Sequence, residues 1–399
     1  MHKKKTLNNN FNFELITNVV SGPNSINYVH RFLEEKNYKN IGLIVDNNLL
    51  KRSDYIKSFL KKTKKKIFKK VLYFNGTSEP TYQNLDLVVR TLKKKVYKFD
   101  CLVAIGGGST IDFTKGIATL LKNAGNALRY RGFPKKLKPS IPVIAIPSTT
   151  GTGAELAYNA VFTDLKSKKK LGINSKNNYP VLSVLDPNVP AGSPKSVILN
   201  SSLGAITRSI DTMFNKQANK ISKIFSEKSF QLLFNNLPKV LKNRNNLEYW
   251  SQMQWGAYLS VVALLNSSSG PAGTASYYLS SNLFIPQGLG YGISGICFFQ
   301  RNHEKGFYKY SKLFDLIEKK PYKYKKNIPE KEKSKFVLSS FMTILKLNKI
   351  TLKNTNISQY QKKKFYAFLS KNFNISTSNN PVFLNKKDLA IIINKIFKI

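Results

Sequence analysis

A short apolar run that leads straight into three consecutive glycines constrains the fold of this chain more than any other feature. The run, DCLVAIGGGST, covers residues 100–110, and IDFTKGIATLLKN continues at helical spacing to residue 123. Because glycine has no Cβ, its backbone can approach a ligand closely, and the free amides at the start of a helix favour an anion such as phosphate. The segment therefore predicts a buried strand feeding a phosphate-binding helix, with a tight turn that holds no ligand as the alternative.

Other apolar runs repeat this arrangement through the first half of the chain. We expect buried strands at residues 40–46, 69–76 and 141–149, and an amphipathic helix at residues 81–96. Continuously apolar strands that alternate with helices are typical of a parallel sheet covered on both faces. The first half is therefore predicted to be an α/β domain.

The pattern changes at residues 185–194, LDPNVPAGSP, where three prolines and a glycine indicate a boundary. Beyond this boundary apolar residues recur at helical spacing. The predicted helices cover residues 197–215, 221–242, 247–266, 271–283, 332–346 and 358–371. The predicted fold class is thus α/β plus α, with an α/β domain at residues 1–190 and a helical domain at residues 191–399. The Lys- and Tyr-rich stretch 305–334 is predicted to be an irregular or mobile loop.

The charge of the chain is extreme, with 65 Lys and Arg against 21 Asp and Glu and a formal net charge of +44. Only 8 of these cations are Arg, which reads bases and phosphates better than Lys does. No zinc-finger spacing or RNA-binding aromatic signature is present. We interpret the lysines as a composition bias that fills a solvated surface, and we expect no specific nucleic-acid partner. A surface that binds polyanions remains the alternative.

Cysteine and histidine are scarce. Cys101 and Cys297 are isolated, which excludes a disulfide framework and a thiolate zinc site. The three histidines are His2, His30 and His303.

The N-terminal residues lack the apolar segment of a signal peptide, and the most apolar run, 258–265, is much shorter than the ~18 residues of a membrane span. We therefore expect a cytoplasmic protein that does not contact a membrane.

Two groups of polar residues follow predicted strands. Asp46 ends the strand at 40–46, where a carboxylate can accept hydrogen bonds from ribose hydroxyls or cap the following helix, and both interpretations stay open. The turn PSTTGTGAE at residues 147–155 follows the strand at 141–149. Its hydroxyls and amides could donate to phosphate or ribose oxygens, although an ordinary polar loop is the alternative.

Taken together, GGGSTIDFTKGIA and IPSTTGTGAE about 40 residues later resemble the iron-containing alcohol dehydrogenase superfamily, which includes dehydroquinate synthase-like folds. The resemblance continues through KLGI, LDP, LGAITRSID and AGTASYYLSSNLFIPQGLG. It implies an N-terminal parallel-sheet nucleotide-binding domain and a C-terminal all-helical domain. It also implies NAD or NADP in the cleft between the domains and a divalent metal, iron or zinc, on the helical side.

Residues 79–180 are most similar to the branch of this superfamily that contains 3-deoxy-manno-octulosonate 8-oxidase. The cues are SEPT, KLGINS, and Ala154 in the TGTGAE turn. Tyr277 also suits that branch, since a Tyr stands there at a position that is often His elsewhere in the superfamily.

The resemblance implies a set of cofactor contacts. The glycine turn would hold the pyrophosphate, Asp46 the adenosine ribose, the second turn the nicotinamide side, and Lys170 the nicotinamide ribose. The implied residues are Asp46, Gly106, Gly107, Gly108, Ser109, Ser148, Thr149, Thr152 and Lys170. Asp112 and Lys115 are expected to fix the turn and its helix.

The metal site of the superfamily is missing from this sequence. Superfamily members ligate the metal with Asp and His four residues apart on one helix and with two further His. The corresponding positions here are Gly204, Arg208, Gly273 and Gln287. Glycine has no side chain to ligate with, and an arginine that is always protonated cannot ligate. We therefore expect no metal.

Two functions are consistent with these residues. In the first, the protein is an NAD(P)-linked oxidoreductase acting on a small alcohol, aldehyde or sugar acid. Arg208 would then replace the metal as a fixed cation, Gln287 would orient the substrate, and Tyr277 or Tyr278 would donate the proton. In the second, the protein is an inactive nucleotide-binding or scaffold relative in which Arg208 fills the old site or pairs with Asp211. A homodimer is possible by analogy with the superfamily.

Overall fold

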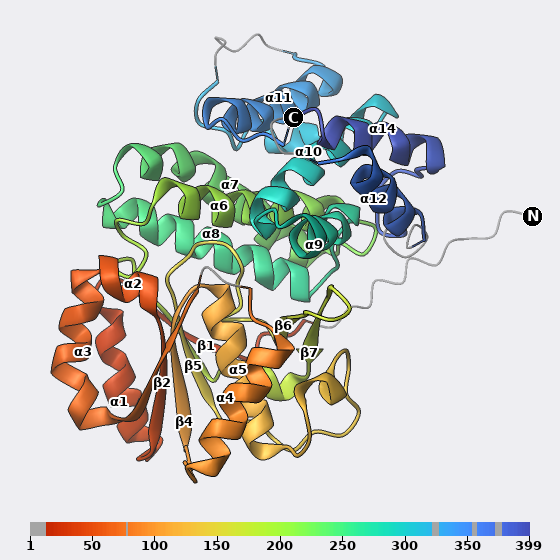
Figure 1. Cartoon of the computed structure of the whole chain (residues 1–399). Coiled ribbons are helices and arrows are strands. Elements are labelled where there is room, and N and C mark those ends of the chain that lie inside the picture. The colour runs from red at the N-terminus through yellow and green to blue at the C-terminus, as the bar shows by residue number, and fades with distance from the viewer. Residues whose placement is uncertain (1–12, 77–78, 321–326, 353–356, 372–376) are drawn as a thin grey trace, which may run out of the picture.

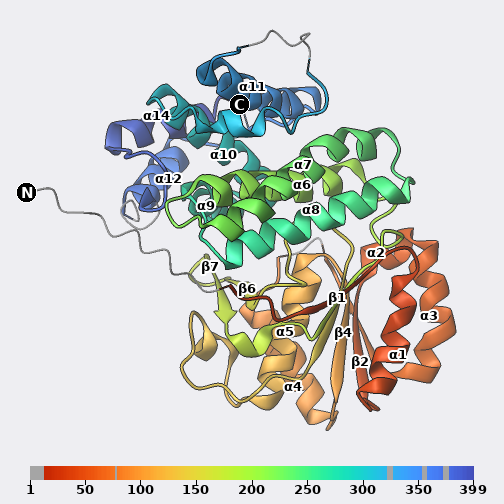
Figure 2. The same ribbon diagram turned by 180° about the vertical axis from the view of Figure 1, so that it is seen from behind.

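The computed structural model describes residues 13–76, 79–320, 327–352, 357–371 and 377–399. It contains a sheet domain, which ends with the last strand at Leu185, and a helical domain, which begins at Lys195. Figure 1 shows the helical domain lying across one end of the sheet, and Figure 2 shows the same two layers from behind. The loop that follows strand β5 (Val143–Pro147) meets the helical domain, since Gly151 lies against Ser201 and Gly153 against Val261.

The sheet has six parallel strands in the order β1-β8-β5-β4-β2-β3. The strands are β1 (Asn18–Ser21), β2 (Ile41–Asp46), β3 (Phe68–Phe74), β4 (Cys101–Gly106), β5 and β8 (Leu182–Leu185). Side chains alternate between its two faces, so that Leu43 and Val45 enter one apolar core and Ile44 enters the other. Both faces are therefore buried, as the continuously apolar strands predict.

Helices cover both faces of this sheet. They are α1 (Tyr28–Glu35), α2 (Asn47–Arg52), α3 (Asp54–Ile67), α4 (Tyr82–Lys94) and α5 (Gly108–Lys122). Apolar residues of α1 and α3 share a core with Leu43, and those of α4 and α5 share the opposite core with Ile44. The predicted α/β architecture is confirmed, as are the strands expected at 40–46, 69–76 and 141–149 to within a few residues.

Sequence analysis missed four strands. β1 and β8 are only four residues long and pair with each other at one side of the sheet. β6 (Asn159–Asp164) and β7 (Lys169–Asn174) form a separate antiparallel hairpin, and Lys168 at its turn has a positive φ of 52°. Short strands and a hairpin with many lysines carry a weak periodic signal, because their stability comes from pairing with distant residues.

Within its described residues, the helical domain contains the six predicted helices and two more. The helices are α6 (Lys195–Phe214), α7 (Lys220–Lys242), α8 (Leu247–Leu265), α9 (Pro271–Leu283), α10 (Gln287–Glu304), α11 (Glu330–Leu347), α12 (Gln359–Lys371) and α14 (Lys386–Ile396). The predictions for α6, α7, α8, α9, α11 and α12 are confirmed, whereas α10 and α14 were not predicted. Within residues 305–334, a 3-10 helix covers Lys309–Leu313 and α11 begins at Glu330, while residues 321–326 lie outside the described part.

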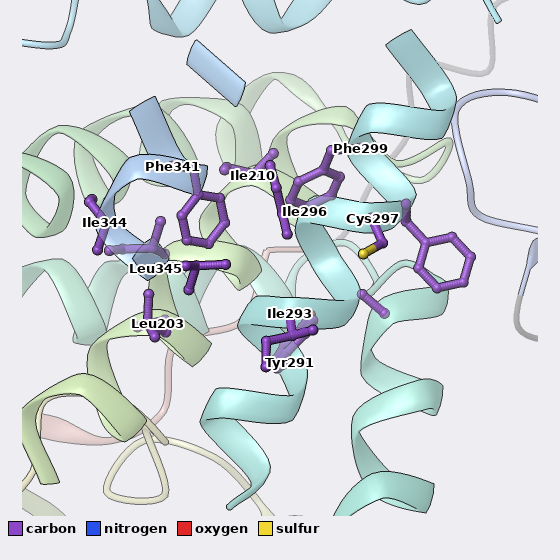
Figure 3. Packing of buried hydrophobic residues seen from close by; sticks show 14 of the residues in the cluster. Leu203, Ile210, Tyr291, Ile293, Ile296, Cys297, Phe299, Phe341, Ile344 and Leu345 are labelled. Atoms are coloured by element: carbon purple, nitrogen blue, oxygen red, sulfur yellow. The ribbon is translucent and has the colours of Figure 1, made fainter. Parts of the chain in front are cut away.

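Helix α10 was missed because four glycines lower its helix propensity. The same glycines let α10 pack closely against α6. A Cβ at Gly288 would overlap the backbone carbonyl of Asn200, and a Cβ at Gly295 would overlap Thr207. Figure 3 shows the result, with Leu203 and Ile210 of α6, Ile293 of α10 and Phe341 of α11 in one core.

Candidate active site

The glycine turn connects β4 to α5 at the end of the sheet that faces the helical domain. Gly106 ends β4, Gly107 is the N-cap of α5 without a side-chain capping bond, and Gly108 begins the helix. A Cβ at Gly106 would lie 2.5 Å from Thr110 Oγ1, and a Cβ at Gly108 would lie 2.5 Å from Thr152 Oγ1. Larger residues would therefore not fit at Gly106 and Gly108, and the start of α5 is a helix N-terminus of the kind that favours an anion.

The second turn packs against the glycine turn. Ser148 N donates to Gly106 O at 2.9 Å, and a Cβ at Gly107 would lie 3.2 Å from Thr149. The structure thus brings together Ser148, Thr149 and Thr152 with Gly106, Gly107, Gly108 and Ser109.

Two buried hydroxyls in these turns lack hydrogen-bond partners. Within the described residues, Thr110 Oγ1 and Thr150 Oγ1 are both unpaired. A buried polar atom without a partner costs free energy, so an oxygen-rich ligand at this place would be favoured. The residues therefore fit a bound phosphate group, as a nucleotide cofactor would supply.

Asp46 caps the helix that follows its strand. Its Oδ1 accepts from Asn48 N at 2.9 Å and from Leu49 N at 3.4 Å, which is the N-cap geometry considered above. Its Oδ2 lies against Gly76, where a Cβ would overlap it. Asp46 is also next to the glycine turn, since its Cβ would lie 3.0 Å from a Cβ at Gly106. The cap is observed, and a contact from Asp46 to a ribose stays a prediction.

Asp112 and Lys115 fix the first turns of α5 to the hairpin. Lys115 Nζ donates to Ala157 O at 2.6 Å and Asn159 O at 3.0 Å, and Asp112 Oδ2 accepts from Val161 N at 3.0 Å. Burial raises the pKa of Asp112 to about 6 and lowers that of Lys115. Their contacts are with the protein backbone, which agrees with the predicted structural role.

Lys170 joins the two domains. Its side chain is only 3% exposed, and its Nζ donates to Glu79 Oε2 at 2.6 Å and to Gln287 Oε1 at 2.7 Å. Glu79 belongs to the sheet domain, whereas Gln287 begins α10. The Nζ atom also lies 6.0 Å from the centre of the Tyr277 ring. Lys170 is thus directed at Gln287 and Glu79, and a contact with a ribose stays a prediction.

The two candidate tyrosines have different surroundings. Tyr278 packs against Phe365 and Phe368 at ring-centroid distances of 5.1 and 4.8 Å, so it belongs to the core. Tyr277 is 40% exposed, and its hydroxyl bonds to Gln287 and lies within electrostatic range of Arg208. Burial of the hydroxyl raises the pKa of Tyr277, and the Arg208 charge opposes this shift. Of the two tyrosines, Tyr277 is therefore the one whose hydroxyl lies beside Gln287 and near Arg208.

Arg208 is held by two neutral oxygens. Its Nη1 donates to Gly151 O at 2.8 Å and to Ser260 Oγ at 3.0 Å. The expected alternative of an ion pair with Asp211 is wrong, because Asp211 accepts from Tyr291 Oη at 2.9 Å and from the Gly270 amide instead. Burial of Asp211 raises its pKa to about 7. Arg208 therefore connects α6 to the second turn of the sheet domain.

The four former ligand positions do not fit a metal. A Cβ at Gly204 would lie 3.1 Å from Gly288 Cα, so α10 occupies the place that an acidic side chain would need. Gly273 has more room, with Ser269 Oγ as the nearest atom at 3.6 Å from a Cβ. Across the described ranges, no group of three or more His, Cys, Asp or Glu could hold a metal ion.

The same ranges contain no helix long and apolar enough to cross a membrane.

Sequence analysis missed three residues of this site, Glu79, Ser260 and Tyr291. Glu79 is 91 positions from Lys170, and Ser260 is 52 positions from Arg208, so no local pattern connects either pair. Tyr291 follows Gln287 by one helical turn, but α10 was not predicted.

Comparison with known proteins agrees with this geometry. The family model for iron-containing alcohol dehydrogenase matches residues 17–187, and the model for the C-terminal part of the Fe-containing alcohol dehydrogenase family matches residues 198–397. Alcohol dehydrogenase 4 of Schizosaccharomyces pombe is 30% identical over 254 residues, which are 63% of this chain and 59% of the relative. NAD-dependent methanol dehydrogenase of Bacillus methanolicus is 29% identical over 190 residues, 48% of this chain and 50% of the relative. The matched segment thus spans about half to three fifths of the length of these relatives.

Solved structures share the fold over nearly the whole chain. The crystal structure of 1,3-propanediol oxidoreductase has a TM-score of 0.86 at 20% identity, covering 97% of this chain and 100% of its own. Sulfoacetaldehyde reductase from Bifidobacterium kashiwanohense, solved in complex with NAD+, has a TM-score of 0.84 at 17% identity, covering 97% of this chain and 98% of its own. The two family models together span both domains, and the chain therefore belongs to the iron-containing alcohol dehydrogenase family.

Proposed function

We propose that this protein is an NAD(P)-linked oxidoreductase that interconverts a small alcohol with its aldehyde or ketone, or acts on a sugar acid, without the divalent metal of its family. Two turns that pack against each other at the start of α5, and the unpaired hydroxyls within them, support nucleotide binding. The names of relatives such as NAD-dependent methanol dehydrogenase support the reaction class.

The cofactor would lie along the two turns. Gly106, Gly107, Gly108 and Ser109 would hold the pyrophosphate at the start of α5, and Ser148, Thr149 and Thr152 would line the nicotinamide side. Asp46 Oδ2 would accept from the adenosine ribose, and Lys170 would lie near the nicotinamide ribose. A bound nicotinamide supplies or accepts the hydride.

The position of Arg208 is the observation that carries the metal-free proposal. Nη1 is fixed by Gly151 O and Ser260 Oγ, whereas Nε and Nη2 have no acceptor among the described residues. A fixed cation with free donors can stabilise the negative charge that develops on a carbonyl oxygen during reduction. Arg208 would thus take the electrostatic role of the metal at the position where a family ligand stood.

Tyr277 and Gln287 complete the proposed catalytic group. Gln287 is held by Lys170 at 2.7 Å and bonds to the Tyr277 hydroxyl, so the amide is fixed beside the cleft. Tyr277 Oη would give a proton to the reduced oxygen or take one from the alcohol. Gln287 would orient both the tyrosine and the substrate.

Replacing Arg208 tests this proposal. We expect Arg208→Ala to lower kcat/KM for NAD(P)H-dependent aldehyde reduction by roughly 100- to 1,000-fold, the usual effect of removing one donor to a developing oxyanion. Affinity for NADH or NADPH, measured by isothermal titration calorimetry, should change much less than kcat/KM, because the glycine turn is untouched and only the bond to Gly151 O in the second turn is lost. Arg244→Ala is the control, since this exposed arginine lies in the loop before α8 and should leave both values unchanged.

The same assays are run after chelation and again with added iron or zinc. Full activity in the chelated enzyme supports the metal-free mechanism. Activity that appears only with added metal would contradict it.

An inactive nucleotide-binding or scaffold relative is the second candidate. The bond from Arg208 to Gly151 O favours it, because this bond connects the domains and could simply fill the old metal site. Calorimetric binding of NAD(H) or NADP(H) without turnover of any alcohol or aldehyde would support this candidate.

A third candidate, polyanion binding through the +44 charge, predicts salt-dependent retention on heparin without nucleotide affinity. The homodimer and the cytoplasmic location stay predictions.

A further inference from the structure

Arg208 is a cation without an anionic partner in the part of the chain that the structure describes. No carboxylate oxygen lies within 4.0 Å of its guanidinium. The acid on its own helix, Asp211, is bonded to Tyr291 and the Gly270 amide. Glu155 lies within electrostatic range but not in contact, and burial raises its pKa to about 7.

The other cation of the cleft is already neutralised. Lys170 Nζ is paired with Glu79 at 2.6 Å and bonded to Gln287. Arg208 therefore carries the uncompensated positive charge of this site. A partly buried charge without a counter-ion is costly, and this cost is removed when an anionic ligand binds.

The free donors of Arg208 define the shape of that ligand. Nη1 is used by Gly151 O and Ser260 Oγ, which fixes the plane of the guanidinium. Nε and Nη2 remain, and these nitrogens can donate in parallel to two oxygens of one planar group. A carboxylate next to a carbonyl offers such a pair, one oxygen from each group.

We propose that the substrate carries a carboxylate adjacent to its reacting carbon, so that the enzyme interconverts a 2-oxo acid and a 2-hydroxy acid. This inference rests on the proposed oxidoreductase function and names its substrate class. Arg208 holds one carboxylate oxygen and the carbonyl oxygen together, as a divalent metal would by chelation. A neutral aldehyde offers one oxygen only and leaves the cation without a counter-ion.

The reaction balances with a nicotinamide cofactor as the second substrate. In the reduction, the carbonyl carbon gains a hydride from the reduced nicotinamide and a new C–H bond forms. The C=O π electron pair moves to the oxygen, which takes a proton from Tyr277 Oη, and Tyr277 regains its proton from solvent. The products are the 2-hydroxy acid and the oxidised cofactor. Arg208 contacts the substrate throughout and changes no bond.

A matched pair of substrates tests the inference. Pyruvate and pyruvamide have the same carbonyl and nearly the same shape, but only pyruvate is an anion. We expect kcat/KM with NADH or NADPH to be roughly 100-fold higher for pyruvate, since a site built around a charged hydrogen bond rejects the analogue that lacks it. Glyoxylate and its amide give a second pair of this kind.

Binding of oxamate to the wild-type protein with NADH provides a readout that does not need turnover. We expect calorimetric binding of oxamate, no binding of the neutral oxamide, and loss of oxamate binding in Arg208→Gln. Arg208→Lys should recover part of the affinity, because it keeps the charge but loses the planar pair of donors. Tyr277→Phe should still bind oxamate while its turnover falls, which separates substrate binding from proton transfer.

The outcomes distinguish this inference from the proposed function. Equal turnover of pyruvate and pyruvamide, or better turnover of neutral aldehydes, overturns the substrate class but leaves the oxidoreductase function standing. Oxamate binding that depends on Arg208, without turnover of any substrate, supports the anion site and overturns the oxidoreductase function. Absence of both oxamate binding and turnover overturns both.

Discussion

At the scale of single residues, the buried pair of Asp211 and Tyr291 explains how Arg208 remains available to a ligand. Asp211 lies three residues after Arg208 on α6 and would be its natural partner. Tyr291 Oη donates a hydrogen bond to Asp211 Oδ2 at 2.9 Å. The other oxygen, Oδ1, lies close to Gly270, where a Cβ would be only 2.5 Å away, so both carboxyl oxygens are held away from the arginine. The charge of Arg208 is left for the cleft.

Asp211 should also make stability depend on pH. Burial raises its pKa to about 7 in the native state, so the folded chain keeps a proton that the unfolded chain releases near pH 4. The free energy of unfolding should therefore fall as pH rises from about 4 to about 7. We expect the free energy of unfolding of Asp211→Asn to depend less on pH in this range. The difference in free energy of unfolding between the variant and the wild type should change by on the order of 1–3 kcal/mol from pH 4 to pH 7. Urea unfolding at several pH values measures the effect.

Asp54→Asn provides the control for that experiment. The hydrogen bond with Lys57 lowers the pKa of Asp54, so its contribution is present above about pH 4 and is lost only below it. Its stability curve should run parallel to wild type between pH 5 and about 7. If Asp211→Asn also runs parallel to wild type there, Asp211 does not hold a proton in the native state.

At the scale of elements, α6 and α10 contact each other closely at Gly204, a position that corresponds to a metal ligand of the family. Glycines on both helices make this contact, and Gly288 lies where a ligand side chain from position 204 would have to pass. The close approach of the two helices therefore agrees with the absence of an acidic side chain at position 204. Restoring an acid at Gly204 alone would press it against the backbone of α10.

Two glycine substitutions should change stability in opposite directions. A Cβ at Gly295 would overlap Thr207, so Gly295→Ala should lower the free energy of unfolding by about 1–3 kcal/mol, as overpacked cores do. A Cβ at Gly273 meets nothing closer than 3.6 Å in a helical segment, so Gly273→Ala should be neutral or raise stability by up to about 1 kcal/mol. Thermal and urea unfolding of both variants checks this, and equal effects would show that the α6–α10 contact is not tight.

At the scale of the whole molecule, two charged side chains bond across the boundary between the domains. Lys170 and Arg208 make these bonds from opposite sides, Lys170 reaching Gln287 and Arg208 reaching Gly151. Beside these bonds, an apolar cluster of Leu156 and Leu185 with Tyr258, Val261 and Val262 also joins the two domains. The charged bonds can be tested one at a time.

Lys170→Gln should weaken cofactor binding without unfolding either domain. Losing a charged hydrogen bond between the domains removes about 1.5–3 kcal/mol, so we expect the Kd for NADH or NADPH to rise roughly 10-fold or more. Lys169→Gln is the matched control, because Lys169 is the exposed neighbour on the same strand. Calorimetry measures both variants, and an unchanged Kd for Lys170→Gln would mean that the bridge does not contribute to the cofactor site.

Local chemistry explains how much could be predicted from the sequence. The strands that carry Asp46 and Gly106 are continuously apolar, and the helices α6 to α9 have clear periodicity, so these elements follow from short-range preference. The three consecutive glycines predict a turn in which the backbone can approach a ligand closely, because few residues other than glycine allow such an approach. The absent metal ligands were also visible, since an arginine or glycine cannot ligate through its side chain.

Only the tertiary structure decided which side chains meet. Lys170 and Gln287 are 117 positions apart, and Arg208 and Gly151 are 57 apart, so no local pattern could pair them. Helix α10 forms against its propensity because its glycines allow close packing on α6, which is a property of two helices together. The sequence by itself indicated the family, the two glycine-containing turns and the presence of Gly204, Arg208, Gly273 and Gln287 at the positions that correspond to the family's metal ligands. Long-range packing determined that Arg208 keeps two free donors and Tyr277 an exposed ring, because a side chain's partners depend on the folded chain around it.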